Sequence, residues 1–297
     1  MAGDYGWQKW KWVLLFILPS LIGLLVFVFT PIATSFWLAF QNWNLLSPPK
    51  FVGLDNFNAL FADPEFWSAL RYTLGFIFLY IPLVFVLGLG LALLLNQKLR
   101  GVIVVRAVTF VPVIASWVVI SLIWKWIFNP QYGLVNYGLS IFGIQGPAWL
   151  FDPNVALYAL VITSVWKDLG YVAMLYLGGL QGIADQYYEA AKIDGATAWD
   201  RLRYVTLPLL TPTMFFIVII LLINSFQAFD QFWLMPMPGS AAQRNVQSIV
   251  TEVVKQAFSY NRMGYASAMS WVLFVLIFVI TFVQFRLQKR WVYYETE

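Results

Sequence analysis

The 297-residue chain contains no cysteine and no histidine, and only 11% of its residues are charged. These absences exclude disulfides, thiol nucleophiles, zinc sites with Cys or His ligands, histidine proton relays and Ser-His-Asp chemistry. The chain also lacks a Gly-x-x-x-x-Gly-Lys-Ser/Thr phosphate loop, so it cannot cradle ATP in the usual way. We therefore expect no catalytic residues and no metal ligands.

Apolar residues are abundant. They make up 61% of the chain, far from the balance of a soluble globular domain. A transmembrane helix needs about 20 mostly apolar residues, and continuous runs of this kind disfavour a β-barrel. The first run lacks a cleavage pattern and is expected to remain as a helix. We predict an all-α membrane protein, a single domain over 1–297, with six transmembrane helices at about 12–38, 72–95, 105–126, 155–179, 209–232 and 265–285.

Lysine and arginine are distributed unevenly between the two sides that six spans define. Cytoplasmic loops are enriched in these residues, so the bias predicts that both termini are cytoplasmic. The pI near 9.2 then reflects topology, and nucleic-acid binding is not expected. The cytoplasmic set is Lys9, Lys11, Lys98, Arg100, Arg106, Lys192, Arg201, Arg203, Arg286, Lys289 and Arg290; the external set is Lys50, Arg71, Lys125, Arg244, Lys255 and Arg262.

The loop 184–208, between the fourth and fifth runs, is polar and carries its own start and stop signals. Asp185 is a plausible N-cap for a helix that Gly195 ends with a left-handed cap. Thr197 can cap a second short helix, with Asp200 in capping-box position, and Pro208 then opens the fifth span. This pattern predicts a compact helix-turn-helix elbow on the cytoplasmic face. A simple amphipathic loop is the alternative.

Motifs in this loop resemble a known family. Glu189-Ala-Ala, Asp194-Gly195-Ala196 and Leu207-Pro208 are similar to the EAA signature of permease subunits of binding-protein-dependent ATP-binding-cassette (ABC) importers. Further segments look like the carbohydrate-uptake branch, which includes maltose-type and glycerol-phosphate-type permeases. These are Arg100-Gly101 with Arg106 and Pro112, Trp124-Lys-Trp-Ile-Phe128, Gly179-Leu-Gln-Gly-Ile183, Phe226-Gln-Ala-Phe-Asp230 and Met263-Gly-Tyr-Ala-Ser-Ala268.

Two positions depart from the family pattern. Ile183-Ala184 replaces the usual Ile-Pro, which leaves coupling intact. Met235-Pro-Met-Pro-Gly239 replaces Thr-x-Gly-Gly-Pro after the fifth span. The family pattern therefore says little about the external gate or the substrate of this chain.

The resemblance implies a multi-pass permease of the bacterial plasma (inner) membrane. Its cytoplasmic coupling helix would lie between helices 4 and 5 and contact an ATPase through Glu189, Ala190, Ala191, Asp194 and Gly195. The implied partners are a second permease, which the family pattern favours as a distinct homologue, two ATPase subunits, an external solute-binding protein, a sugar-type substrate and membrane lipid. No cofactor is expected on this chain, because ATP and Mg would bind the partner ATPase.

Polar residues inside the predicted spans are candidates for the substrate path. Lys167 and Asp168 lie near the middle of the fourth span, where a charge costs at least about 2.5 kcal/mol. Packing against a partner permease is the alternative role for this pair. The end of the fifth span combines amide, hydroxyl and carboxylate groups with aromatic rings, which suits a sugar or polyol, although interhelical hydrogen bonding would use the same groups. The candidates here are Asn224, Ser225, Gln227, Asp230 and Gln231, of which Asn224, Gln227 and Gln231 are expected on one helical face.

Other functions remain open at this point. An ion-gradient-driven secondary transporter would usually show internal repeats and broken helices in matched positions, and neither is evident. An intramembrane enzyme is weakened by the missing His and Cys, and a scaffold or channel component is a further alternative. Among importers, a phosphorylated polyol such as glycerol phosphate is the alternative substrate. An unpaired Asp230 in the path would repel an anion and so favours a neutral sugar, unless Lys125 or a partner's cation neutralises its charge.

Overall fold

The computed structural model describes residues 5–97 and 101–293. Lys98 and Arg100, which the topology prediction uses, lie outside the described residues, and the side chain of Lys9 is not described. Among the described residues, five helices are long and apolar enough to cross a membrane, and there are six spans if one bent helix pair is counted as a single span. The orientation of the termini stays a prediction.

The chain forms two compact units, and the prediction of a single transmembrane domain stays a prediction. The first unit contains the residues up to Asp63 together with Val253–Val272. Its elements are α1 (Tyr5–Leu24), a π-helical segment (Leu25–Phe29), α2 (Thr30–Leu38), strands β1 (Gln41–Asn42) and β2 (Lys50–Phe51), α3 (Asp55–Ala62), a π-helical turn (Lys255–Ser259) and the start of α15 (Met263–Trp291).

In this unit α1, the π-helical segment and α2 form one long helix, as predicted for the first span. Pro31 lies at the start of α2 and lacks a backbone N–H, and the Thr30 hydroxyl donates to the Leu25 carbonyl across the π-helical segment, 2.9 Å. The two strands pair antiparallel, with Gln41 opposite Phe51 and Asn42 opposite Lys50.

The second unit contains Pro64–Glu252 and the residues from Leu273 on. Its elements are α4 (Pro64–Leu95), α5 (Val102–Ile114), α6 (Trp117–Ile127), α7 (Leu134–Ile141), α8 (Pro153–Gln181), α9 (Asp185–Ile193), α10 (Ala198–Arg201), the π-helical turn η2 (Leu202–Thr206), α11 (Leu207–Phe226), α12 (Asp230–Leu234), α13 (Ala241–Asn245), most of α14 (Ile249–Val254) and the remainder of α15.

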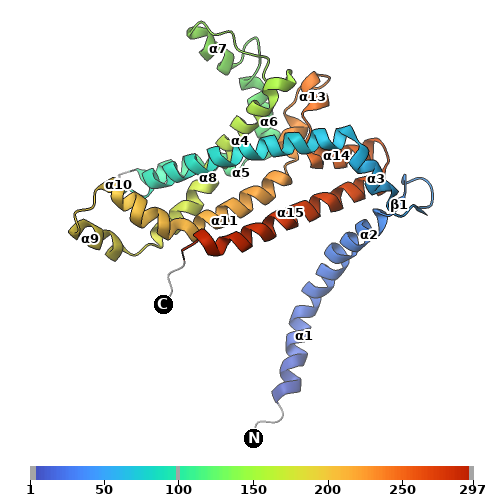
Figure 1. Ribbon diagram of the computed structural model, residues 1–297, viewed down its shortest axis with the longest axis horizontal. Coiled ribbons are helices and arrows are strands. Elements are labelled where there is room, and N and C mark those ends of the chain that lie inside the picture. Colours follow the sequence, from blue (N-terminus) through green and yellow to red (C-terminus); the bar gives the residue numbers. More distant parts are fainter. Residues whose placement is uncertain (1–4, 98–100, 294–297) are drawn as a thin grey trace. The chain divides into compact units, whose positions relative to one another are not determined.

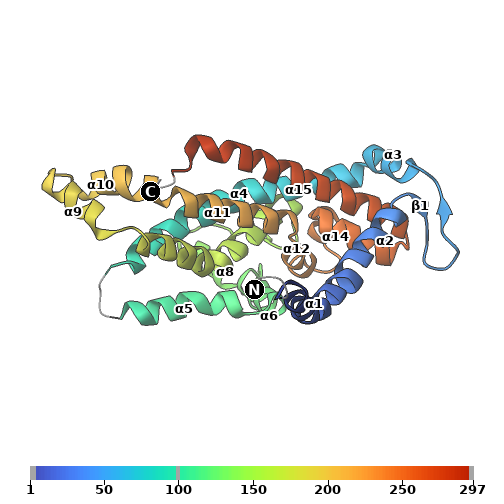
Figure 2. The same ribbon diagram turned by 90° about the horizontal axis from the view of Figure 1, so that it is seen from below.

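The core of the second unit lies between α4, α8 and α11, which pack side by side (Figures 1 and 2). Its buried side chains include Val84, Tyr176 and Ile217. Gly88 and Ala92, one turn apart on α4, are buried, and a Cβ at Gly88 would lie 2.6 Å from Val172 of α8. Small residues therefore let these two helices approach closely, as membrane helices commonly do.

The predicted third span, 105–126, is not one straight helix. It is the pair α5 and α6, bent by 100°. Pro112 removes a backbone donor near the end of α5, Ala115 is extended, and the Ser116 hydroxyl accepts from the Val119 N–H at the start of α6, 3.4 Å. The bend is therefore a helix end followed by a new helix start.

The predicted fifth span, 209–232, is interrupted as well. α11 ends at Phe226, and Gln227 and Phe229 leave the helical conformation before α12 begins at Asp230. The carbonyl freed at Ala228 accepts a hydrogen bond from the Ser248 hydroxyl, 2.6 Å. The irregular backbone is thus satisfied by protein, which is the condition for its presence at membrane depth.

α14 and the π-helical turn that follows it lie partly inside the protein, whereas Phe258 near the end of the turn is 66% exposed. Ile249 and Glu252 are each at most 2% exposed, and the Ile249 N–H donates to the Thr73 hydroxyl of α4, 3.1 Å. This bond holds the start of α14 against α4.

Candidate functional site

The elbow between α8 and α11 is built from local capping interactions. α9 ends in a Schellman motif: Gly195 has φ +79°, its N–H donates to the Lys192 carbonyl, and the Ala196 N–H donates to the Ala191 carbonyl. This confirms the predicted left-handed cap. The predicted N-cap is wrong by one residue, because Ala184 occupies that position without a side-chain bond and Asp185 lies in the first helical turn.

The second half of the elbow is a capping box followed by a continuous helix. The Thr197 hydroxyl accepts from the Asp200 N–H, 3.2 Å, and the Asp200 carboxylate accepts from the Thr197 N–H, 3.0 Å, as predicted. The separate second helix through Tyr204 is not observed, since α10 continues through η2 into α11. A continuous helix transmits displacement to the fifth span more directly than a hinged one.

The candidate coupling residues lie on the exposed part of the elbow. Glu189, Ala190, Asp194 and Gly195 are exposed and Ala191 is half-buried. Sequence reasoning missed two large apolar side chains there: Ile193 is 86% exposed and Trp199 is 65% exposed. In Figure 2 α9 and α10 lie at the opposite end of α11 from α12.

One side-chain bond ties α9 to the base of the fifth span. The hydroxyls of Tyr188 and Thr206 share a hydrogen bond of 3.1 Å, and the Thr206 hydroxyl also bonds the Arg201 carbonyl. These bonds link α9 to η2, which continues into α11.

At the other end of α11 a cavity of about 230 Å³ opens. Every path candidate from the end of the fifth span lines it, together with Asp168 of α8. The structure thus brings these predicted residues together, although by a route that the sequence did not indicate, because the chain turns at Gln227 instead of continuing as a helix. The lining residues are Phe76, Tyr80, Trp117, Asp168, Asn224, Ser225, Gln227, Ala228, Phe229, Asp230 and Gln231.

Polar and aromatic groups alternate around this cavity. The Tyr80 hydroxyl donates to the Asp168 carboxylate, 2.7 Å, and the Phe76 and Tyr80 rings stack with centroids 5.0 Å apart. Phe229 stacks on Trp233 beside the opening. The sequence analysis missed Phe76, Tyr80 and Trp117; the four-residue spacing of Phe76 and Tyr80 on α4 was the available signal.

Lys167 is the one path candidate that the structure separates from the others. It is 7% exposed, and it is not among the described residues that line the cavity. Its ammonium donates to the Val113 carbonyl of α5, 3.1 Å, and lies 5.4 Å from the centroid of the Trp117 ring. Lys167 and Asp168 therefore point to different neighbours, as expected for adjacent residues on a helix.

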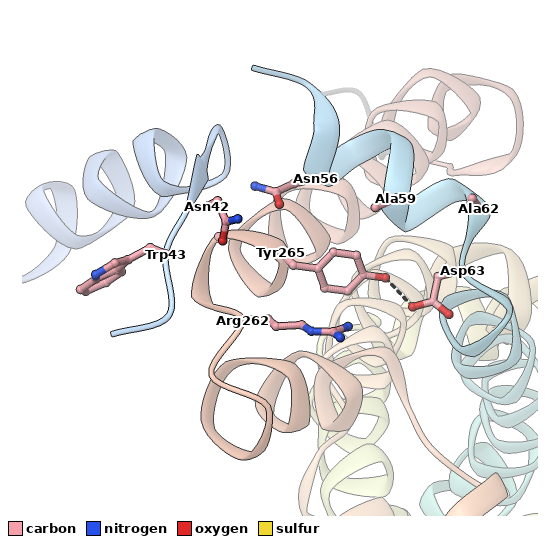
Figure 3. A pocket seen from close by; sticks show the side chains of 9 residues that line it. Asn42, Trp43, Asn56, Ala59, Ala62, Asp63, Arg262 and Tyr265 are labelled. Carbon is pink, nitrogen blue, oxygen red and sulfur yellow. Dashed lines mark hydrogen bonds between the residues drawn. The ribbon is translucent and has the colours of Figure 1, made fainter. Parts of the chain in front are cut away.

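The first unit contains a polar pocket of about 500 Å³ between α3 and the start of α15 (Figure 3). The Tyr265 hydroxyl donates to the Asp63 carboxylate, 2.6 Å, and the Asn56 amide donates to the Ala39 and Gln41 carbonyls. Gly264 is required here, because a Cβ at this position would meet the Gln41 carbonyl oxygen. Arg262, Asn42 and Trp43 complete the polar wall.

Comparisons with known proteins agree with this architecture. Residues 85–293 match the family described as binding-protein-dependent transport system inner membrane component. The trehalose/maltose transport system permease protein of Thermococcus litoralis is 36% identical over 281 residues, covering 93% of this chain and 92% of that protein. The lactose transport system permease protein of Rhizobium radiobacter is 32% identical over 275 residues, covering 91% and 92%.

Among solved structures, the chain is similar to a bacterial ABC transporter involved in import of the acidic polysaccharide alginate, with a TM-score of 0.84, 26% identity and coverage of 95% of this chain and 96% of that one. A second structure of an alginate ABC transporter, in complex with its alginate-bound periplasmic protein, gives a TM-score of 0.85 at 25% identity, covering 97% of this chain and 98% of that one. The chain therefore belongs to the family of binding-protein-dependent transport system inner membrane components, and is a multi-pass plasma-membrane permease subunit of an ABC importer.

Proposed function

We propose that this chain and a second permease subunit form the translocation pathway for a neutral sugar or sugar-derived solute. Two separate ATPase subunits would supply the energy, and an external solute-binding protein would deliver the solute. The cavity beside the end of α11 carries the proposal, because it combines side-chain amides and carboxylates with aromatic faces. Hydroxylated ligands are held by such groups.

The charges around the cavity favour a neutral solute over a phosphate ester. Asp168 and Asp230 contribute carboxylates, and none of the described lining residues is lysine or arginine. A polar cavity with negative groups and no cation disfavours an anion. Relatives named for trehalose/maltose and lactose transport support this choice, and the glycerol-phosphate alternative lacks a cation in the described wall.

The proposed mechanism is alternating access driven through the elbow. Closure of the ATPase subunits would move α9, the Tyr188–Thr206 bond would pass this movement to the start of α11, and the far end of α11 forms the cavity wall. ATP binding would thereby open the cavity outward, and hydrolysis would return it inward. Glu189, Ala190, Ala191, Asp194 and Gly195 are the proposed ATPase contacts, with Gly195 supplying turn geometry.

We propose that the external protein docks on segments 41–71 and 234–264. Both segments follow odd-numbered spans, whereas the elbow follows an even-numbered one, so membrane topology assigns them to the opposite face. The polar pocket around Asp63 and Tyr265 is lined by residues of the first segment and by the end of the second, and it offers a cation, two amides and an indole to a protein surface (Figure 3). An ion-gradient-driven mechanism is not favoured, because the matching family is binding-protein-dependent.

Uptake measured in vesicles with the assembled importer tests the proposal. We expect uptake to require ATP and the binding protein, and the Asn224→Leu and Gln227→Leu variants to raise the half-saturating solute concentration without loss of assembly. Tyr158→Phe, an exposed position on α8 outside the described cavity wall, is the control. Uptake that persists without any ATPase subunit, or that is unchanged in both cavity variants, would overturn it.

A further inference from the structure

The bend between α5 and α6 lies beside the one buried lysine described in the fourth span. The last carbonyls of any helix have no donor within that helix and carry its partial negative charge. At membrane depth such groups must be satisfied by protein. The Val113 carbonyl, in the last turn of α5, is satisfied by the Lys167 ammonium, 3.1 Å away.

A second contact fixes the same pair of helices. Gly170 lies one turn beyond Lys167 on α8, and a Cβ at this position would meet the carbonyl oxygen of Thr109, one turn before Val113 on α5. Backbone therefore lies on backbone at Gly170, while the long Lys167 side chain reaches the helix end. Together the two positions fasten the last two turns of α5 to α8.

The fastened segment leads directly into the cavity wall. Trp117 is the first residue of α6, it lines the cavity, and its ring faces the Lys167 ammonium at 5.4 Å. The next residue of α8, Asp168, holds Tyr80 of α4 at another part of the same wall. Two adjacent residues of α8 thus contact two different parts of the lining of one cavity.

We propose that Lys167 is a positioning residue for solute binding. By bonding the end of α5 it sets the direction in which α6 leaves the bend, and so it holds Trp117 against the cavity. The effect on solute rests on the proposed function of that cavity; the effect on the bend does not.

The direct test is the geometry of the bend. Because the chain contains no cysteine, cysteines introduced at the exposed positions Val111 and Ile123 can be spin-labelled in the assembled importer without competing thiols on this chain. We expect Lys167→Met to shift or broaden the distance distribution across the bend, Lys167→Arg to preserve it, and Gly170→Ala to shift it while keeping the lysine. An unchanged distribution in both Lys167→Met and Gly170→Ala overturns the proposal.

Uptake gives the functional readout in the same variants. We expect Lys167→Met to raise the half-saturating solute concentration between about three- and twentyfold, the range of interhelical hydrogen bonds in membranes, with solute-independent ATPase activity unchanged. Lys289→Met, in the last turn of α15 and outside the described cavity wall, is the control and should leave affinity unaltered. A shifted bend with unchanged affinity would show that Lys167 positions the bend but that the cavity does not bind the solute.

Discussion

The elbow and the cavity are both polar interruptions of apolar helices. They differ in where the hydrogen-bond partners of their polar groups come from. The elbow uses its own residues: the Schellman turn at Gly195 and the Thr197–Asp200 capping box lie within 15 residues of the start of α9. The cavity uses bonds between elements distant in sequence, such as Tyr80 with Asp168 and Ser248 with Ala228. The elbow can therefore move as a preformed piece, whereas the cavity changes whenever its helices shift.

This difference suits the proposed function, in which force would enter at the elbow and be used at the cavity. A self-contained elbow transmits displacement without deforming. A cavity bounded by separate helices responds to that displacement by changing shape. Variants in the elbow should alter coupling, and variants in the cavity should alter affinity.

The largest expected effect comes from reversing the charge of Glu189. This side chain is exposed on α9, and replacing an interfacial charge by its opposite costs about 2–5 kcal/mol in binding. We expect Glu189→Lys to lower uptake at least about tenfold while solute affinity and membrane insertion stay normal. Asp185→Lys on the same helix makes the same charge change and is the control. Normal transport by the Glu189 variant would remove this residue from the coupling surface.

A smaller effect, on solute affinity and not on coupling, is expected from Tyr80→Phe. The change leaves the Asp168 carboxylate without the 2.7 Å donor, and a hydrogen bond to a charged group contributes about 1.5–3 kcal/mol. We expect the half-saturating solute concentration to rise about tenfold, with the ratio of ATP hydrolysed to solute transported unchanged. A change in that ratio with unaltered affinity would contradict the division between the two regions.

Gly195→Ala tests whether the shape of the elbow matters apart from its contacts. The glycine has φ +79°, and an L-residue in the left-handed region costs about 1–2 kcal/mol. We expect a several-fold loss of coupling without a change in affinity, and a smaller loss for Gly195→Asn, since asparagine tolerates this conformation. ATPase activity and uptake measured together check the result. Equal losses for the two variants would point to contact instead of conformation.

The smallest effect is expected from Thr197→Ala. Loss of an N-cap side chain costs about 1 kcal/mol, so amide exchange at Asp200 should accelerate about fivefold. Uptake should change little, because the second half of the elbow continues into α11 and is held by it. A large loss of uptake would show that the capping box, and not the continuous helix, transmits movement.

The features predicted best from the sequence are those that depend on residues close together in the chain. Gly195, Thr197 and Asp200 act within a few positions of one another, so their pattern was sufficient for the cap and the capping box. The Asp185 N-cap was misplaced because Ala184 already has the extended conformation of that position. Helix boundaries depend on such single-residue differences.

Features set by distant contacts were only partly predictable. The amides at the end of the fifth span were identified by composition, but the turn at Gln227 depends on Ser248 bonding the Ala228 carbonyl, 20 residues away in the chain. Similarly, hydropathy cannot distinguish one straight span from the bent pair α5 and α6, because both halves are apolar. Lys167 was predicted to line the substrate path because of its charge. Its bond to the Val113 carbonyl of α5 joins residues far apart in the sequence and was not predicted.

The close approach of α4 and α8 at Gly88 has a mechanical consequence. With Val172 filling the space that a side chain at Gly88 would need, the two helices cannot slide past each other without opening a gap in the lipid-excluded core. We expect α4 and α8 to move together as one piece at this crossing, and a bulky residue at Gly88 to separate them. The changes in the cavity would then come from shifts of the other elements that line it against this pair.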